Sequence, residues 1–219
     1  FSMKTKFKII ILIILLLSAL FINTKVSALM PLSGKIIVID PGHGGKDPGT
    51  TSDTIYEKDI NLAISKFLEI ELTKVGASVI MTRDDDYDLA EPNARWRKKS
   101  DFDNRIQLIN NSKANFYLSI HLNYLTNSTY HGPQIFYDKE ENKELATIIK
   151  NTLNSNLNTN REIKPIPKKT YMYDKLTIPG VLIECGFLSN LEEKNKLITE
   201  EYQQKLASLI KDAIIEYFN

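Results

Sequence analysis

Two histidines and two glutamates stand at the ends of apolar segments, where side chains from different parts of a chain can meet. His43 follows an apolar run through a Pro-Gly turn, and His121 closes a second apolar run. Glu184 closes a third run, and Glu57 opens a segment with helical periodicity. Two imidazoles and one carboxylate form a ligand set of catalytic zinc sites, which keep the fourth tetrahedral position for water. His43, Glu57 and His121 therefore predict a zinc site, and Glu184 remains as a carboxylate without a metal.

Each of these residues also has an interpretation that involves no metal. Glu57 lies in the first turn of the predicted helix, where a negative charge contributes about 0.3–1 kcal/mol. His121 could be a hydrogen-bonded core histidine. Glu184 could pair with Arg83 or Arg105. Structural roles for all of these residues at once explain the pattern less well than a metal site does, because an unpaired acid at the end of an apolar strand is costly to bury.

Strands and helices alternate along the chain, and their order decides whether these residues can meet. Continuous apolar runs predict buried strands at residues 36–39, 78–82, 116–121, 135–137 and 181–184. Apolar residues at steps of three and four predict helices at residues 57–75, 103–112, 140–157, 191–198 and 201–218. A strand, a helix and a further strand in this order favour a parallel βαβ unit. Ligands usually bind at the carboxyl ends of such strands, where His43 and His121 stand.

A polar segment of mixed charge, residues 84–101, interrupts this pattern. It contains the basic run Arg95-Trp96-Arg97-Lys98-Lys99, which could contact an anionic or sugar-containing substrate. Charge runs usually face water, so a solvated loop with Trp96 packed onto the domain is the favoured interpretation. The third histidine, His131, lies in a polar loop and is not expected to bind metal.

Composition and charge restrict the class of protein. The chain has 219 residues, enough for one domain, and hydrophobic residues make up 42% of it, which allows a sizeable core. A formal net charge of +1 argues against a nucleic-acid binder, which normally carries a strongly basic face. The one cysteine, Cys185, cannot form a disulfide within the chain. It alternates away from Glu184 on the predicted strand and is expected to pack in the core rather than to bind metal.

The N-terminal region is typical of an export signal. Three lysines precede an almost wholly apolar stretch, residues 9–22, and Val26-Ser27-Ala28 has the small-residue pattern of a cleavage site. This stretch is shorter than the about 20 residues that a spanning helix needs, so a cleaved signal is favoured over a retained anchor. Residues 1–28 are thus the predicted signal peptide, with residues 1–2 as a cloning remnant, and residues 29–219 form the folded domain. Membrane contact is expected only through the first segment, if it stays uncleaved.

Four motifs, in order along the chain, resemble those of the zinc-dependent N-acetylmuramoyl-L-alanine amidases, the type-3 catalytic domains of cell-wall hydrolases. The motifs are Asp40-Pro41-Gly42-His43-Gly44-Gly45, Glu57-Lys58-Asp59, Ser119-Ile120-His121-Leu122-Asn123 and Leu182-Ile183-Glu184-Cys185-Gly186-Phe187-Leu188-Ser189-Asn190. The resemblance extends from about Lys35 to the end of the chain. It implies a single α/β domain, with a twisted, mostly parallel sheet and helices on both faces.

The resemblance also implies a role for each residue that matches a motif. His43, Glu57 and His121 would bind one Zn²⁺ per chain. Glu184 would be the catalytic acid/base. Asn123, two residues after His121, could contact substrate or orient a metal ligand. Arg83 and Arg105 match recurrent positions of the family outside these motifs and are candidates for the same roles. The reaction implied is hydrolysis of the amide between N-acetylmuramic acid and the L-alanine of the stem peptide in peptidoglycan.

Within the family, the layout and the run from Glu184 to Phe187 are most similar to the small germination-specific amidases of spore-forming bacteria. These enzymes trim spore-cortex peptidoglycan and enable formation of muramic-δ-lactam. The resemblance thus implies export across the cytoplasmic membrane to the cell wall or the spore cortex. No cell-wall-binding module is recognisable beside the domain, so an exported accessory protein is an expected partner.

Two other functions stay open at this point. A zinc peptidase that cuts within the stem peptide would use the same metal chemistry. A catalytically inactive peptidoglycan-binding domain would be expected to lose a ligand or the acid/base, whereas this chain keeps all four residues. A nucleophile-based hydrolase is disfavoured, because the sequence has no Gly-x-Ser-x-Gly motif.

Overall fold

The computed structural model describes residues 2–5, 7–18 and 30–219 with their side chains, and residue 6 and residues 19–29 as backbone alone. The described chain forms a six-stranded sheet in the order β4-β1-β5-β8-β6-β7. Its strands are β1 (Ile36–Pro41), β4 (Ser78–Met81), β5 (Phe116–Asn123), β6 (Gln134–Tyr137), β7 (Lys164–Pro165) and β8 (Gly180–Phe187). Strands β4, β1, β5 and β8 run parallel, β6 runs antiparallel to β8, and β7 pairs parallel with β6. The prediction of a mostly parallel sheet is confirmed.

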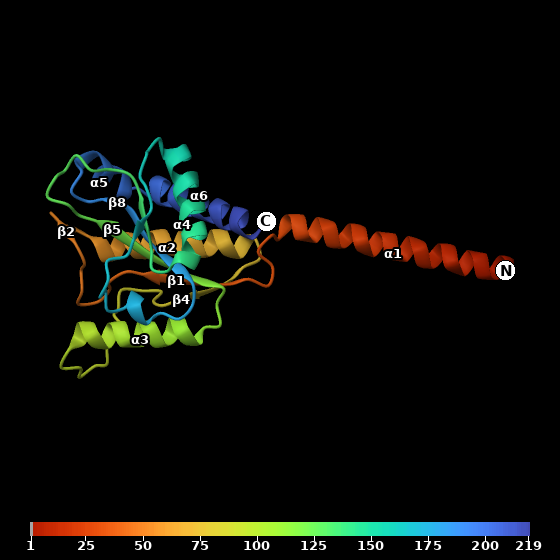
Figure 1. Cartoon of the computed structure of the whole chain (residues 1–219), viewed down its shortest axis with the longest axis horizontal. Helices are drawn as coiled ribbons and strands as arrows, with labels where there is room; N and C mark the ends of the chain where they lie inside the picture. The colour runs from red at the N-terminus through yellow and green to blue at the C-terminus, as the bar shows by residue number, and fades with distance from the viewer. Residues whose placement is uncertain (1) are drawn as a thin grey trace.

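Helices cover both faces of the sheet, as predicted (Figure 1). The helices are α2 (Glu57–Lys74), α4 (Lys143–Leu157) and α6 (Glu200–Phe218) on one face, and α3 (Arg97–Asn111) on the other. The short helix α5 (Leu191–Leu197) follows β8. Ile37 of β1 enters the larger apolar core under the first group of helices, and Val38 enters the core under α3. Successive strand residues thus fill opposite cores, because their side chains alternate across the sheet.

Helix α2 shows why one of these elements forms where it does. Its buried apolar residues recur every four positions: Ile60, Ile64, Leu68 and Leu72. Glu57 and Asp59 lie in its first turn, where acidic side chains are favoured. Gly76, with a φ of 95°, follows its end, as expected for a glycine after a helix. The helix thereby starts at the sheet edge with Glu57 as its first residue.

Some local structure was not predicted. Residues Thr51–Ser52 (β2) and Ile55–Tyr56 (β3) form a small antiparallel hairpin just before α2. Helix α3 begins at Arg97 rather than at residue 103, because its first turn is charged and lacks the apolar period on which the prediction rested. Trp96 is 67% exposed, so the prediction that it packs onto the domain is wrong. The described chain also has two 3₁₀ turns, η1 (Glu140–Asn142) and η2 (Tyr173–Lys175).

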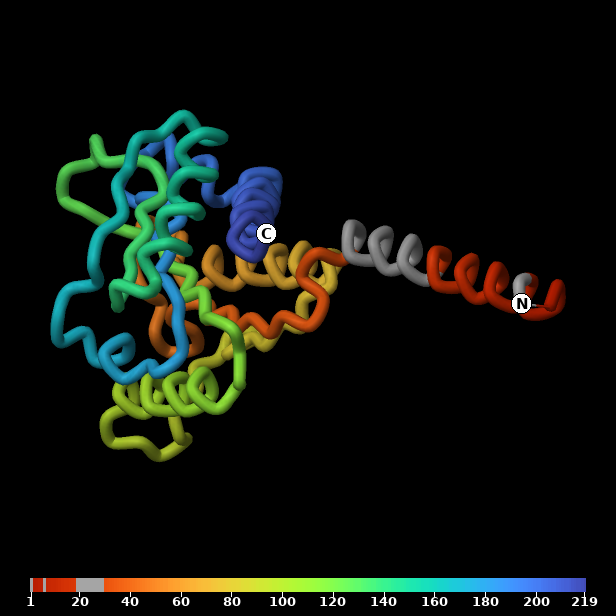
Figure 2. The backbone as a smooth tube through the Cα atoms, turned by 45° about the vertical axis from the view of Figure 1, so that its right-hand side comes forward, coloured from red at the N-terminus to blue at the C-terminus, as the bar shows by residue number. Residues whose placement is uncertain are grey.

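The predicted export signal lies in helix α1 (Met3–Leu29). Its apolar side chains from Ile9 to Leu17 are 43–62% exposed, and Figures 1 and 2 show this part of the helix away from the sheet. Within the described residues, no helix combines the length and the apolar character that crossing a membrane requires. Phe1 and the side chains of the cleavage motif Val26-Ser27-Ala28 lie outside the described residues, so cleavage stays a prediction.

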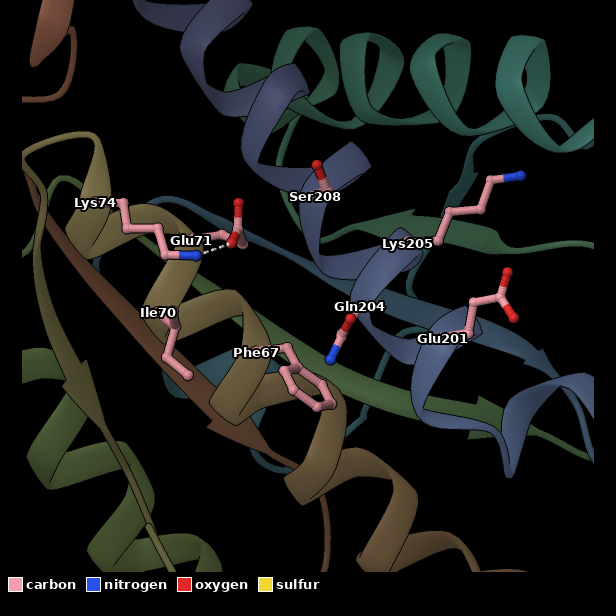
Figure 3. A pocket seen from close by; sticks show the side chains of 8 residues that line it. All are labelled: Phe67, Ile70, Glu71, Lys74, Glu201, Gln204, Lys205 and Ser208. Atoms are coloured by element: carbon pink, nitrogen blue, oxygen red, sulfur yellow. Dashed lines mark hydrogen bonds and ion pairs between the residues drawn. The ribbon is translucent and has the colours of Figure 1, made fainter.

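A hollow of about 550 Å³ lies between α2 and α6 (Figure 3). Phe67 and Ile70 give it an apolar lining on α2, and Lys74 pairs with Glu71 at 2.7 Å. The lining residues on α6 are Glu201, Gln204, Lys205 and Ser208. The predicted metal ligands are not among the residues that line this hollow, so it is separate from the site at the sheet edge.

Candidate metal centre

The predicted metal ligands meet at the carboxyl edge of the sheet, where neighbouring strands end. His121 lies in β5, between β1, which leads to His43, and β8, in which Glu184 is its register partner. Glu57 reaches this edge as the first residue of α2. His43, Glu57 and His121 each offer one ligand atom, and these three atoms lie within 4.8 Å of one another. The fold thus brings the three residues together from distant parts of the chain.

Glu57 is the centre of this group. Its Oε1 atom lies 3.2 Å from His43 Nε2 and 3.0 Å from His121 Nδ1. The residue is only 3% exposed, and burial alone would raise its pKa. Hydrogen bonds with His121 and His43 outweigh burial and hold the pKa of Glu57 well below its usual range. The carboxylate therefore stays ionised, which a metal ligand requires.

Asp47 orients the imidazole of His43. His43 Nδ1 lies 2.9 Å from Asp47 Oδ2, so that Nε2 faces Glu57. Burial lowers the pKa of His43, but hydrogen bonds with Asp47 and Glu57 raise it to about 9. A carboxylate on the second ring nitrogen is a common partner of a metal-binding histidine, because it fixes the orientation of the ring.

Two arginines hold the loop that carries His43. Arg83 donates from Nε to the carbonyl of Pro41 and from Nη2 to the carbonyl of Gly42, both at 3.0 Å. Arg105 donates to the carbonyl of Pro41 at 2.9 Å and to that of His43 at 2.6 Å. Three successive carbonyls are thereby fixed. These bonds hold His43 at a φ of 63°, a conformation that costs a non-glycine residue about 1–3 kcal/mol.

Both arginines are buried, at 1% exposure, and bond within the protein. Arg105 also pairs with Asp40 at 2.7 Å and with Asp101 at 3.0 Å. Arg83 Nη2 donates to the carbonyl of Lys58 at 2.8 Å, which links the His43 loop to the first turn of α2. These positions fit the predicted role of orienting a metal ligand and leave little surface for substrate.

Glu184 lies at the same edge and is partly exposed, but one of its two carboxyl oxygens is buried. Its Oε2 atom is buried and has no hydrogen-bond partner among the described residues. Burial, and then the charge of Glu57, raise the pKa of Glu184 to about 8. The two arginines considered as alternative partners, Arg83 and Arg105, are bonded elsewhere. A carboxyl group with a strongly perturbed pKa beside a possible metal site is a candidate functional group.

The chemistry of the donor set fits zinc. Two imidazoles and one carboxylate within reach of one ion leave a fourth tetrahedral position open. Outer hydrogen bonds support the ligands: Asp47 lies behind His43, and the Leu122 N–H donates to Glu57 Oε1 at 3.1 Å. The unpartnered oxygen of Glu184 adds a group that can exchange protons beside this set.

Comparisons with known proteins identify the family. A family model described as N-acetylmuramoyl-L-alanine amidase matches residues 37–216. The chain belongs to this amidase family. The amidase is 44% identical, over 195 residues, to the germination-specific N-acetylmuramoyl-L-alanine amidase of Bacillus subtilis (strain 168). The match covers 86% of this chain and 82% of that protein, and it confirms the predicted family and enzyme class.

Solved amidase structures share the fold. The CwlD amidase from Clostridioides difficile, solved in complex with the GerS lipoprotein, is 41% identical to this amidase, with a TM-score of 0.80. That match covers 84% of this chain and 98% of the other. The N-acetylmuramoyl-L-alanine amidase from Clostridium difficile 630 is 35% identical, with a TM-score of 0.73, over 84% of this chain and 96% of that one. The predicted single α/β domain is therefore the fold of known amidases.

Two residues that support the site of the amidase were not predicted from the sequence. One is Asp47, whose position four residues after His43 in a glycine-rich loop was the available signal. The other is Asn61, which is fully buried and lies four residues after Glu57 on α2. Its Nδ2 atom donates to the carbonyl of Gly42 and to Glu57 Oε1, both at 3.3 Å. Asn61 thus joins the loop before His43 to the carboxylate of Glu57.

The remaining predicted residues lie near the site or in the core. Asn123 ends β5 two residues after His121, where the register with β8 shifts. Its contact with substrate stays a prediction. Cys185 is fully buried in the larger core, as predicted. His131 lies in the loop between β5 and β6, and its Nδ1 atom is 3.1 Å from the carbonyl oxygen of Thr129.

Proposed function

We propose that the amidase uses one Zn²⁺, held by His43, Glu57 and His121, to hydrolyse the amide between N-acetylmuramic acid and L-alanine in spore-cortex peptidoglycan. The observation that carries this proposal is the convergence of three ligand atoms within 4.8 Å beside Glu184, whose Oε2 atom is buried without a hydrogen-bond partner in the described part of the chain. The cortex assignment rests on the similarity to the germination-specific amidase of Bacillus subtilis. Removal of the stem peptide would free the lactyl carboxyl group from which muramic-δ-lactam forms. This lactam is in turn needed for germination.

Zinc in such a site supplies Lewis acidity, which activates water and polarises an amide carbonyl. The Glu184 carboxylate would accept the proton that water loses as its oxygen bonds to the carbonyl carbon. Glu184 would then give this proton to the leaving nitrogen as the C–N bond breaks. The products are a lactyl carboxylate on the glycan and a free stem peptide that begins with L-alanine.

The surrounding residues would keep the ligands in place during this reaction. Asp47 and the two buried arginines fix His43, and Asn61 fixes Glu57. Holding the reacting groups before substrate arrives lowers the barrier, because little reorganisation is left for the transition state. Asn123, at the end of β5, is the residue that we propose to contact substrate.

Mass spectrometry of digested peptidoglycan tests this reaction. The expected products are free stem peptides that begin with L-alanine, together with an intact glycan. Shortened peptides that stay on the glycan would indicate a zinc peptidase instead. Binding without any release of peptide would indicate an inactive binding domain. A chelator-treated sample is the control, and added zinc should restore its activity.

We also propose that residues 1–28 direct export, so that residues 29–219 act at the cell wall or the spore cortex. The exposed apolar side chains of α1 and the motif Val26-Ser27-Ala28 support this proposal. N-terminal sequencing of the secreted protein should begin at Leu29. A membrane-bound form that begins at Met3 would indicate a retained anchor.

An exported accessory protein is the proposed partner. Support comes from the similar CwlD amidase, which was solved in complex with the GerS lipoprotein. A partner that binds the folded amidase also stabilises it, so zinc content and activity should rise when such a lipoprotein from the same cell is added. Full activity and full zinc occupancy of the isolated amidase would exclude the need for a partner.

A further inference from the structure

A small hollow at the candidate metal centre has lysine side chains beside it. Its lining residues include the two histidines of the centre and two aromatic residues: His43, His121, Phe102 and Tyr171. Lys98 Nζ lies 5.7 Å from the centroid of the Phe102 ring, and Lys175 Nζ lies 3.8 Å from the centroid of the Tyr171 ring. Helix α3 and the turn η2 thus each place a positive charge next to this hollow.

Lys98 is connected to His43 through a single carboxylate. Its Nζ atom lies 3.2 Å from Asp47 Oδ2, and the same oxygen lies 2.9 Å from His43 Nδ1. Lys46 precedes Asp47 in the chain and lines, together with Asp47 and Lys98, a second hollow. Only the Asp47 carboxylate and one imidazole ring therefore separate the Lys98 ammonium from His43 Nε2, which faces Glu57.

We call Lys46, Lys98 and Lys175 the lysine rim, and all three residues are exposed. The acids that line the two hollows are already paired within the protein: Asp40 and Asp101 with Arg105, Asp88 with Arg97, and Asp47 with His43 and Lys98. An ammonium group has three donors, so Lys98 can hold Asp47 and still bind a second carboxylate. The whole chain has a formal net charge of only +1, so the rim is a local concentration of positive charge.

The proposed substrate carries its free carboxylates in the stem peptide. The lactyl group of the glycan forms part of the scissile amide and has no charge. The residue after L-alanine is D-glutamate, which is linked through its side chain, so its α-carboxyl group is either a free carboxylate or an amide. In an extended peptide this group lies about 7 Å from the scissile nitrogen, because each residue spans about 3.5 Å. It can therefore reach a lysine that stands one carboxylate and one imidazole away from the ligand group.

We propose that the lysine rim binds the α-carboxylate of the residue after L-alanine, so that the amidase prefers stem peptides in which this group is free. The inference rests on the proposed function, which places the scissile amide beside His43 and His121. The ammonium groups attract a carboxylate, whereas a neutral amide at the same position gains no such attraction. The rim would thus distinguish two forms of peptidoglycan that differ only in the amidation of this residue.

Two matched preparations of uncrosslinked peptidoglycan test this inference. They are identical except that the second residue of the stem peptide is D-glutamate in one and its α-amide, D-isoglutamine, in the other. In low salt, the zinc-loaded wild type should release the D-glutamate peptide with a kcat/KM about 5-fold higher, the scale of an exposed ion pair. This preference should shrink at about 1 M salt, because the screening length falls to about 3 Å.

Removing the charges of the rim should remove the preference. Lys98→Gln should reduce it, and Lys98→Arg should keep it, because a guanidinium group retains the charge. Lys46→Gln, Lys98→Gln and Lys175→Gln combined should bring the ratio of the two kcat/KM values close to one. Loss of the contact between Lys98 and Asp47 would slow both substrates alike, so this ratio separates substrate recognition from any effect on His43.

A second triple variant is the matched control. It combines Lys74→Gln, Lys143→Gln and Lys205→Gln, which change the net charge by the same amount. These lysines are also exposed, and they lie on α2, α4 and α6, with Lys74 and Lys205 at the separate hollow shown in Figure 3. The control should keep the wild-type preference for the free carboxylate.

Three results would overturn the inference and leave the proposed function intact. One is a wild type that cleaves both preparations equally well in low salt, or that prefers the amide. Another is a preference that high salt does not reduce. The third is a folded triple variant of the rim that keeps the full preference. A wild type that releases no peptide from either preparation would overturn the proposed function instead.

Discussion

The carboxyl groups of Glu57 and Glu184 lie at the same edge of the sheet, but their surroundings shift their pKa values in opposite directions. Burial would raise the pKa of Glu57, but His121 and His43 hold it well below its usual range. Burial and the charge of Glu57 raise the pKa of Glu184 to about 8. Paired acids whose pKa values are pushed apart commonly divide the work of a site between them. Glu57 suits an ionised ligand, and Glu184 suits a group that exchanges protons near neutral pH.

Glu184→Gln separates chemistry from metal binding. The amide keeps the shape of the side chain but cannot accept the proton, so turnover should fall by about 100-fold or more. Zinc content and peptidoglycan binding should stay near the wild-type values. Glu193→Gln is the control, because Glu193 is a buried glutamate that accepts hydrogen bonds from the Gly132 and Phe187 N–H groups and lies outside the ligand group. Loss of zinc in Glu184→Gln would make Glu184 a ligand, and unchanged turnover would remove it from the mechanism.

The pH dependence of stability tests the environment of Glu184 without any turnover. Its pKa is about 8 in the folded protein against an ordinary value of 4.5, so the folded state holds this proton more tightly than the unfolded state. The wild type should therefore lose stability as pH rises from about 4.5 to about 8, in the absence of metal. Glu184→Gln lacks this loss, so its advantage in melting temperature should grow over that interval.

Thermal melts of both proteins with a chelator present measure this difference. Comparing the two proteins at each pH cancels the contributions of His43 and the other titrating groups. Each 1 kcal/mol corresponds to about 2–4 °C in a domain of this size. A difference in melting temperature that is the same at pH 5 and pH 8 would contradict the raised pKa of Glu184.

At the scale of elements, the site depends on how the loop after β1 is fixed to α2 and α3. Arg105 of α3 reaches the carbonyls of Pro41 and His43, and Arg83 bridges the same loop to the start of α2. The loop contains glycines and a non-glycine residue at positive φ, so its own backbone preferences do not hold it in this shape. The backbone at His43 is therefore held in large part by two arginines that follow it by 40 positions or more.

Arg105→Lys should weaken both the fold and the metal site. A lysine ammonium cannot bridge two carboxylates and two carbonyls as the guanidinium does, so the free energy of unfolding should fall by about 2 kcal/mol or more. Zinc affinity, measured by competition with a chelating dye, should fall as well. Arg97→Lys on the same helix is the control, because its ion pair with Asp88 is partly exposed and contributes less than about 1 kcal/mol. Equal losses in the two variants would argue against a special role for Arg105.

The parts of this arrangement that could be predicted are those with a local signal in the sequence. The strands before His43 and His121, and helix α2, follow from apolar periods within one segment. Whether Asn61 bridges Glu57 and Gly42 depends on the distance between two packed elements, and no local period encodes that distance. The charged first turn of α3 likewise becomes helical through contacts that only the folded chain provides.

At the scale of the whole molecule, a metal ion would join three elements that are otherwise connected through the sheet. His43 follows β1, Glu57 starts α2, and His121 lies in β5. An ion bound by all three would bind the folded state and find no such site in the unfolded chain. Metal binding should therefore add directly to the stability of the domain, in addition to enabling the reaction.

The stability of the whole domain should thus report on zinc. At a free zinc concentration of about 100 times Kd, the folded state gains about 2.7 kcal/mol, which raises the melting temperature by about 5–11 °C. His43→Ala and His121→Ala should each lose most of this increase, together with bound zinc and activity. His131→Ala is the control, because His131 lies outside the ligand group and should keep the full increase. Calorimetric melts with and without zinc measure all four proteins. An increase that survives in both His43→Ala and His121→Ala would mean that zinc binds the amidase at some other set of residues.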